Sequence, residues 1–222
     1  MAKVMSIGKC HLCSGTFDKS AMTKHLKSCG QKEGSTAASG GRKADVFHLL
    51  IEGRHYPEYW MHIELPANAR LKALDGFLRD IWLECCGHMS MFTIQGKRYS
   101  VVPMEEFDDA SMEARLSEVL SPGMKFYHEY DFGSTTLLAL KVVSQEQKQV
   151  KGKSVRVLAR NEALEIPCVC CGKPATQVCT ECIYSNAGWL CEACAAEHEC
   201  GEEMLLPVVN SPRVGVCGYT GD

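Results

Sequence analysis

The chain has 222 residues, 45% hydrophobic and 23% charged, with a formal net charge of −3. This length allows one full domain and one or two small ones, and without a run of about 18 apolar residues a transmembrane helix is excluded. The 14 cysteines are numerous, but the first residues contain no apolar signal core, and Cys-x-x-Cys pairs near histidines indicate metal binding rather than a disulfide framework. We therefore expect a cytoplasmic protein, with no membrane partner and no organic cofactor.

Charge is distributed unevenly along the chain. Residues 1–43 carry eight Lys or Arg against two acids, residues 44–160 carry 14 against 16, and residues 161–222 carry two against nine. Zinc bound by three thiolates and an imidazole adds about −1 per site, and zinc bound by four thiolates about −2, so metal makes the C-terminal part more acidic. Residues 1–43 are therefore the expected contact for DNA or RNA.

Residues 1–30 are predicted to form a zinc finger. Its expected ligands are Cys10, Cys13, His25 and Cys29, and metal binding supplies the folding free energy that so small a module lacks. The pattern resembles a ββα zinc finger with Cys as the last ligand, Phe17 as the core aromatic residue and Met22 where the family has Leu. The gap from Cys13 to His25 is one residue shorter than usual.

The finger resemblance implies that Asp18, Ala21 and Lys24 face DNA. Only Lys24 among them is a good ligand for bases or phosphates, and we add Lys19 and Lys27 as candidates for nucleic-acid contact. A zinc-stabilised cap or protein-contact module is the alternative interpretation. Residues 31–44 are rich in Gly and Ser, which is typical of a flexible linker.

Residues 45–160 are predicted to form an α+β domain. Strands are expected at 46–53, 58–66, 125–132 and 135–143, with a hairpin at 91–103 that turns near Gly96. Apolar residues at helical spacing predict a helix over 69–85, and acids at the start of 103–120 favour a second one. Residues 144–166 are expected to be an extended connection.

Four motifs of this domain carry a resemblance to a known family. They are HLLIEG, Pro57-x-x-Trp60, GHMSMF at 87–92 and KFYHEYDFG at 125–133, of which Tyr130 to Gly133 is the most specific. Residues 45–145 resemble the plasmid pRi ORF-three-like family, which includes passenger proteins of insertion elements. This chain has Ser134 where the family usually has Asp, and Met61 and His62 where it usually has basic residues. The resemblance implies a fold and a link to mobile elements.

An enzyme with a site near His88, His128 and Asp131 is the alternative to a scaffold. Strand alternation puts His128 and Asp131 on opposite faces, so one pocket cannot take all the polar groups of 125–132. We expect instead that Tyr130 and Phe132 fill the core, that Asp131 caps the turn at Gly133 and that His88 caps or orients a loop. Cys85 and Cys86 end a helix with no further ligand nearby in sequence, so we expect buried structural thiols there.

Residues 161–222 hold eight soft ligands within 33 residues, which predicts two structural zinc ions. The candidate ligands are Cys168, Cys171, Cys179, Cys182, Cys191, Cys194, His198 and Cys200. Cys217 is the rival of Cys200, since His-x-Cys is a tight spacing. The apolar stretch from 204 onward is expected to pack back as a C-terminal tail.

The spacing of these ligands resembles the cross-brace class of B-box and treble-clef fingers. The resemblance implies that the first and third Cys pairs bind one zinc and that the second pair binds the other with His198. Closed sites with four protein ligands indicate structural rather than catalytic zinc.

With the finger, the sequence predicts three zinc ions in a non-enzymatic interaction protein. Nucleic acid is expected to bind residues 1–43, and a protein partner the acidic residues 161–222. A ubiquitin-ligase-like adaptor is a third possibility, by analogy alone.

Overall fold

The computed structural model describes residues 6–36, 42–104, 106, 108–150 and 155–221. With 21% helix and 38% strand in a large mixed sheet, the chain has the predicted α+β fold. It divides into two compact units. Unit 1 comprises Met1–Phe77 and Met89–Glu162, and unit 2 comprises Leu78–His88 and Ala163–Asp222.

This division differs from the expected order of modules. The finger belongs to the same unit as the central sheet, whereas residues 78–88 belong to the unit of the C-terminal region rich in Cys and His. The expected linker, 31–44, is shorter than its composition suggested: α1 continues to Thr36 and β3 begins at Arg42. Residues 37–41 lie outside the described residues.

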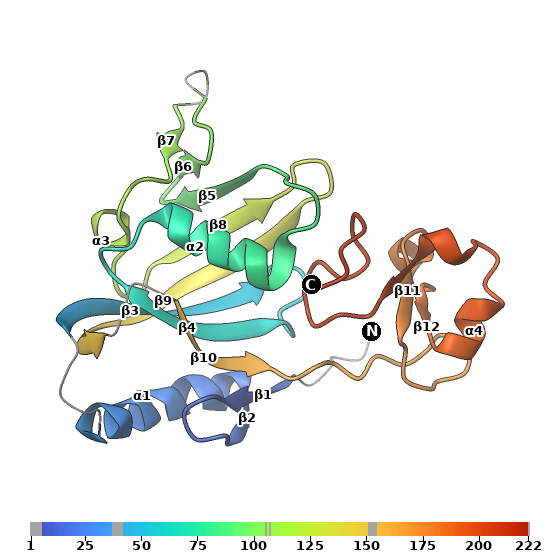
Figure 1. Cartoon of the computed structure of the whole chain (residues 1–222), viewed down its shortest axis with the longest axis horizontal. Helices are drawn as coiled ribbons and strands as arrows, with labels where there is room; N and C mark the ends of the chain where they lie inside the picture. The colour runs from blue at the N-terminus through green and yellow to red at the C-terminus, as the bar shows by residue number, and fades with distance from the viewer. Residues whose placement is uncertain (1–5, 37–41, 105, 107, 151–154, 222) are drawn as a thin grey trace. The chain divides into compact units, whose positions relative to one another are not determined.

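A sheet of ten strands forms unit 1, in the order β2-β1-β10-β4-β3-β9-β8-β5-β6-β7 (Figure 1). The neighbouring strands pair antiparallel except β6 and β7, which are parallel. The bounds are β1 Ile7–Cys10, β2 Thr16–Asp18, β3 Arg42–Gly53, β4 Trp60–Pro66, β5 Ser90–Ile94, β6 Lys97–Ser100, β7 Ala110–Ser111, β8 Lys125–Tyr130, β9 Thr136–Val150 and β10 Arg156–Asn161.

The centre of this sheet is long and buried. β3 pairs with β9 along its whole length, from Arg42 opposite Val150 to Gly53 opposite Leu138, with an irregularity at His48 and Leu49. The chain of β9 therefore runs as strand well into the stretch that we expected to be a connection. Helix α2, Leu71–Leu78, lies across one face of the sheet and buries Leu71, Leu74 and Leu78 completely (Figure 1).

Two expected helices are shorter or different in kind. The predicted helix at 69–85 is α-helical only to Leu78 and continues as a π-helix, η1, over Arg79–Leu83. The predicted second helix is reduced to α3, Leu116–Val119. The segment before α3 pairs instead as β7 with β6, where Arg98 and Asp109 form an ion pair at 3.1 Å, so sheet pairing outweighs the local helix preference.

The hairpin at Gly96 forms as predicted, with positive φ angles at Gln95 and Gly96 that suit a tight two-residue turn. The core prediction holds for Tyr130, which is fully buried, but is wrong for Phe132, which is 46% exposed. Asp131 has a φ of 64°, so the alternation of faces ends there and Phe132 turns outward.

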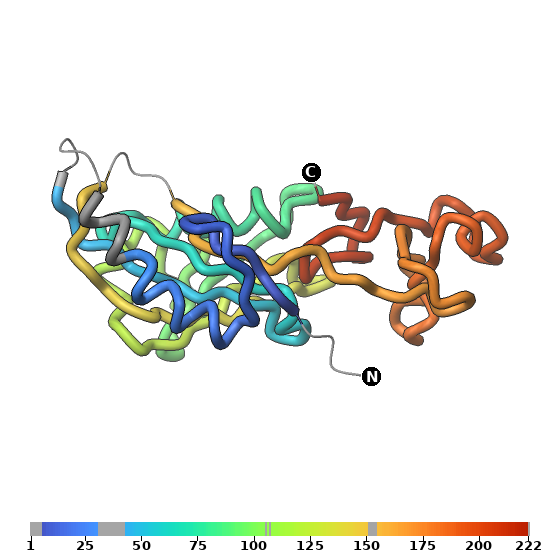
Figure 2. The backbone as a smooth tube through the Cα atoms, turned by 90° about the horizontal axis from the view of Figure 1, so that it is seen from below, coloured from blue at the N-terminus to red at the C-terminus, as the bar shows by residue number. Residues whose placement is uncertain are grey.

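The finger is built into the edge of the large sheet. β1 pairs with β10, and α1, Lys19–Thr36, lies beside these strands in both backbone views (Figures 1 and 2). Met22 and Leu26 of α1 pack with Trp60 of β4 in one buried cluster. The finger therefore shares the core of the sheet instead of relying on its metal alone.

Unit 2 contains a smaller sheet of three strands in the order β12-β11-β13. Its elements are β11 Gln177–Cys179, η3 Cys182–Ser185, β12 Trp189–Leu190, α4 Glu192–Ala196, η4 Glu202–Met204 and β13 Leu205–Pro207. The C-terminal tail is packed, since Ser211, Arg213 and Tyr219 are all buried. Across the described ranges, no helix combines the length and apolar character needed to cross a membrane.

Candidate metal centres

Within the part of the chain that the structure describes, four groups of Cys and His side chains could each hold a metal ion, with their ligand atoms within 4.8 Å of one another. We call them the finger cluster, the first and second C-terminal clusters and the tail cluster. In that order they consist of Cys10, Cys13, His25 and Cys29; Cys168, Cys171, Cys191 and Cys194; Cys179, Cys182, His198 and Cys200; and Cys85, Cys86, His88 and Cys217. The four candidate groups are one more than the three metal ions that we predicted.

The finger cluster joins a turn to a helix. Cys10 is the last residue of β1 and Cys13 lies in the turn that follows, while α1 carries His25 and Cys29 one helical turn apart. Cys13 Sγ lies 3.2 Å from His25 Nε2, and the ring of Phe17 stacks on His25 with centroids 4.2 Å apart. Phe17 thus orients a ligand from the apolar side.

The two C-terminal clusters interleave along the chain. The first takes the first and third Cys pairs, and Cys171 and Cys191 approach to 3.5 Å. The second takes the middle pair with His198 and Cys200, where Cys182 Sγ lies 3.5 Å from His198 Nε2 and 3.6 Å from Cys200 Sγ. Leu190 and Ala195 pack against these ligands as a small buried cluster.

The tail cluster was not predicted from the sequence. Cys86 Sγ lies 2.9 Å from His88 Nε2 and 3.8 Å from Cys217 Sγ, and His88 Nε2 lies 3.2 Å from Cys217 Sγ. Our interpretation of Cys85 and Cys86 as buried thiols is wrong, since Cys85 is half-buried and Cys86 exposed. His88, which we expected to cap or orient a loop, is a candidate ligand of the tail cluster. Cys217 also belongs to the tail cluster, and Cys200 is the candidate ligand that groups with Cys182.

The signal for this cluster was incomplete in the sequence. Cys85, Cys86 and His88 form a short ligand-rich motif, but Cys217 is 131 residues away from Cys86. Only the fold brings the two segments together.

The dimensions of the clusters fit zinc. Zinc binds thiolates at about 2.3 Å and imidazole at about 2.0 Å, so a tetrahedron of such ligands has edges of roughly 3.5 to 3.8 Å. The separations between ligand atoms range from 2.9 to 3.8 Å, so they match these edges or are slightly shorter. Three cysteines with one histidine, or four cysteines, are also the donor sets of closed structural zinc sites.

The thiols of these clusters perturb one another. Hydrogen bonds from backbone groups, of which the one at Cys191 contributes most, lower the pKa of the Cys168 thiol to about 6. Hydrogen bonds with the thiols of Cys200 and Cys179 raise the pKa of Cys182 to about 12, and repulsion between neighbouring thiolates acts in the same direction. A divalent cation among the sulfur atoms removes that repulsion and lets all ligands ionise.

The lysines proposed to contact nucleic acid differ in their surroundings. Lys19 forms an ion pair with Glu52 at 2.5 Å and donates to the Pro57 carbonyl oxygen, so its charge is partly compensated. Lys24 and Lys27 are exposed on α1, away from the face that Met22 and Leu26 bury. Asp18 caps the helix through the backbone N–H groups of residues 20 and 21.

The residues of the alternative enzyme site make separate local contacts. His88 lies in the tail cluster, and His128 is fully buried with Nε2 2.7 Å from Asp75 Oδ1. Asp131 accepts hydrogen bonds from the backbone of Gly133 and Ser134, as the turn prediction required. Nothing among these contacts brings the three predicted residues into one polar site.

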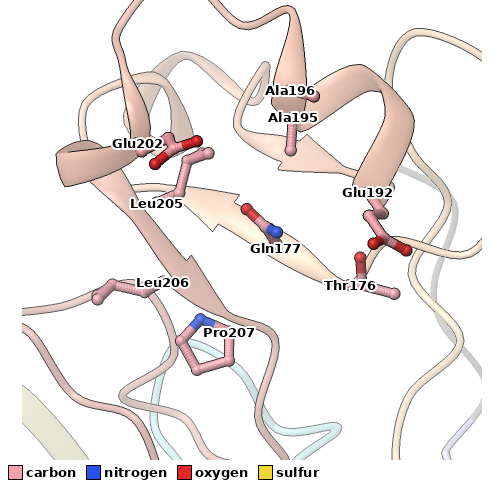
Figure 3. A pocket seen from close by; sticks show the side chains of 9 residues that line it. All are labelled: Thr176, Gln177, Glu192, Ala195, Ala196, Glu202, Leu205, Leu206 and Pro207. Atoms are coloured by element: carbon pink, nitrogen blue, oxygen red, sulfur yellow. The ribbon is translucent and has the colours of Figure 1, made fainter.

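An open groove of about 670 Å³ crosses the small sheet of unit 2. Figure 3 shows Gln177 of β11 at its centre, with Glu202 toward one end and Glu192 of α4 toward the other. Ala195, Ala196, Leu205, Leu206 and Pro207 supply apolar lining. The groove is therefore apolar in its walls and negative at its ends.

Comparison with models of known protein families finds no match, and no curated protein matches the sequence. Among solved structures, a similar chain is a protein of unknown function, MM3350, from Methanosarcina mazei Go1. It is 17% identical with a TM-score of 0.44, and the alignment covers 50% of this chain and 67% of that one.

Proposed function

We propose that this protein is a zinc-stabilised interaction protein that binds nucleic acid through its N-terminal finger and a protein through its C-terminal zinc region. The observation that carries the proposal is the gathering of 16 Cys and His ligands into four closed groups. Each group has four protein ligands, which leaves no open position for substrate and favours structural metal. The interleaved pairs in residues 161–222 support a cross-brace zinc domain.

The nucleic-acid part rests on charge and exposure. Residues 1–43 carry a net excess of six positive charges, and Lys24 and Lys27 stand exposed on the helix that resembles a recognition helix. One finger covers about three base pairs, so the contact is expected to be mainly with phosphates and sensitive to salt.

Binding of a fluorescent 20-base-pair DNA, measured by anisotropy at increasing salt, tests this part. Lys24→Ala and Lys27→Ala should each weaken binding and reduce the slope of log K against log[salt] by about one unit, because each removes one phosphate contact. Lys141→Ala, at an exposed position on β9, is the matched control and should bind as wild type. No retention of DNA or RNA even at low salt would reject nucleic-acid binding.

The protein-binding part rests on the groove of unit 2. Among Lys and Arg, residues 163–222 contain only Lys173 and the buried Arg213. The described residues that line the groove include no Lys or Arg, so Glu192 and Glu202 give it a negative charge. A peptide that combines basic and apolar side chains matches this lining.

A labelled ten-residue peptide of alternating Lys and Leu is a suitable probe, with alternating Glu and Leu for comparison. Glu192→Gln with Glu202→Gln should weaken binding of the Lys-Leu peptide, since the charges that attract it are removed. Glu165→Gln, exposed in the same unit but outside the groove, should leave it unchanged. Equal binding of both peptides would show that charge does not select the partner.

We also propose that residues 45–145 belong to the plasmid pRi ORF-three-like family and that the protein serves a mobile element. The Asp131 carboxylate accepts hydrogen bonds from the backbone N–H groups of Gly133 and Ser134 and so stabilises this turn. This structural role would explain why the family's most specific motif contains an Asp. A reducing compartment such as the cytoplasm fits the free thiols of all 14 cysteines.

A further inference from the structure

We infer that the tail cluster is a zinc site that fastens the C-terminal tail to the segment Leu78–His88, and that its zinc exchanges faster than the other three. This inference goes beyond the proposed function, because it concerns how unit 2 is held together rather than what it binds. It stands or falls without any nucleic acid or protein partner.

The backbone around the cluster is shaped to bring the ligands together. Gly87, between Cys86 and His88, has a φ of 78°, and its N–H donates to the Glu84 carboxylate at 2.6 Å. Cys217 itself has a φ of 50°, an uncommon conformation for a residue with a side chain. Such local strain persists only where the surrounding structure compensates for it, and metal ligation is a means of doing so.

A buried cation lies beside the cluster. Arg213 is completely buried, and its guanidinium Nη2 lies 3.4 Å from Cys85 Sγ. Zinc with three thiolates and a neutral imidazole has a net charge of about −1. The metal-bound site therefore has the negative charge that stabilises a buried guanidinium, whereas three neutral thiols do not provide it.

Hydrogen bonds between the two segments hold them together independently of any metal. Ser211 Oγ donates to the Trp82 carbonyl oxygen at 2.7 Å, and Trp82 Nε1 donates to the Asn210 carbonyl oxygen at 3.1 Å. Figures 1 and 2 both place the C-terminal tail beside η1, Arg79–Leu83, which continues α2. The ligand Cys217 lies within residues 214–219, so we expect loss of its metal to loosen this stretch, although Val214 and Tyr219 are buried.

Accessibility separates the tail cluster from the others. Each of the other three contains a ligand that is almost fully buried: Cys10, Cys168 or Cys179. In the tail cluster every ligand is at least partly exposed, with Cys86 and Cys217 most open to solvent. A chelator can reach this metal without first opening a core.

Metal content of the purified chain tests the site. Wild type should contain four zinc ions, and Cys217→Ser three. Cys170→Ser is the matched control, because Cys170 is exposed but belongs to none of the four groups, and it should retain four. Three ions in wild type, or four in Cys217→Ser, would overturn the assignment.

Release kinetics test the exchange order in wild type, where no variant has to fold. With excess chelator and a colorimetric zinc indicator, one ion in four should leave at least about tenfold faster than the rest, a barrier difference of about 1.4 kcal/mol. Hydrogen exchange after that phase should show residues 214–219 losing protection while β11 keeps it. Release in a single phase, or loss of protection in β11 first, would refute the faster exchange.

Discussion

Two buried histidines connect the finger to the large sheet. His48 Nε2 lies 2.9 Å from His62 Nδ1, and His62 Nε2 lies 3.2 Å from the Thr23 hydroxyl of α1. Burial lowers the pKa of His48 to about 4 and that of His62 to about 3. Both rings are therefore neutral at physiological pH. His62 is completely buried and lies against α1.

These pKa values predict a loss of stability in acid. Both are below the value of about 6.5 for an unfolded histidine, so the unfolded chain binds protons that the folded chain does not. The free energy of unfolding should be unaffected above pH 6.5 and fall as the pH drops from about 6.5 to 4, by on the order of 3 kcal/mol for His48. Urea unfolding at pH 7 and pH 5 measures the difference.

His48→Gln supplies the comparison, because it removes one of the two titrating groups and keeps the zinc ligands of the finger. Its free energy of unfolding should depend less on pH than that of wild type over the same interval. Equal dependence in both proteins would assign the acid sensitivity to the zinc ligands or to carboxylates.

At the scale of elements, the decisive contact is the pairing of β1 with β10. Gly8 lies at this pairing opposite Asn161, and a Cβ there would be 2.5 Å from both the Arg160 carbonyl oxygen and the Trp60 ring. Backbone on one side and a buried indole on the other leave no room for a side chain. The close approach lets the finger form the edge of the sheet and share its core.

Gly8→Ala should therefore destabilise unit 1 by on the order of 2 kcal/mol, through overpacking between strands. Gly76→Ala is the matched control, because it lies in α2 and a Cβ there meets nothing within 4 Å. That change should be neutral or raise stability by roughly 0.5 to 1 kcal/mol, since alanine favours helix over glycine. Thermal unfolding with zinc present compares the two; similar losses in both would show that the Gly8 contact is not limiting.

At the scale of the whole molecule, the two units depend on metal to different degrees. Unit 1 has a ten-stranded sheet with a core that includes Trp60, Phe47 and Phe126. Unit 2 has a sheet of three short strands, and several of its buried residues are the candidate ligands themselves. A region with so little apolar core relies on its metal for folding free energy.

Complete removal of zinc should consequently unfold unit 2 and leave the centre of unit 1 folded. In hydrogen exchange with a strong chelator, amides of β3 and β9 should stay protected while those of β11 and β12 exchange rapidly. The turn that carries Cys13 should lose protection, while the pairing of β1 with β10 should keep the rest of the finger attached to the sheet for longer. Loss of protection in β3 at the same rate as in β11 would contradict this independence.

Local patterns in the sequence determine much of this protein. The Cys-x-x-Cys pairs and the helical spacing of His25 and Cys29 predict ligands that the structure gathers, because such ligands lie within one turn or one helical face. Strand alternation and the turn at Gly96 predict the centre of the sheet for the same reason, since they depend on short-range backbone preferences.

The tertiary structure alone decided what depends on distant segments. Cys217 reaches Cys86 only through folding, β1 finds β10 about 150 residues away, and 103–120 exchanges most of its expected helix for an edge strand. No local preference encodes these pairings, because their free energy comes from burial and strand pairing between remote residues. The tail cluster and the pairing of the finger with the large sheet therefore could not be predicted from the sequence.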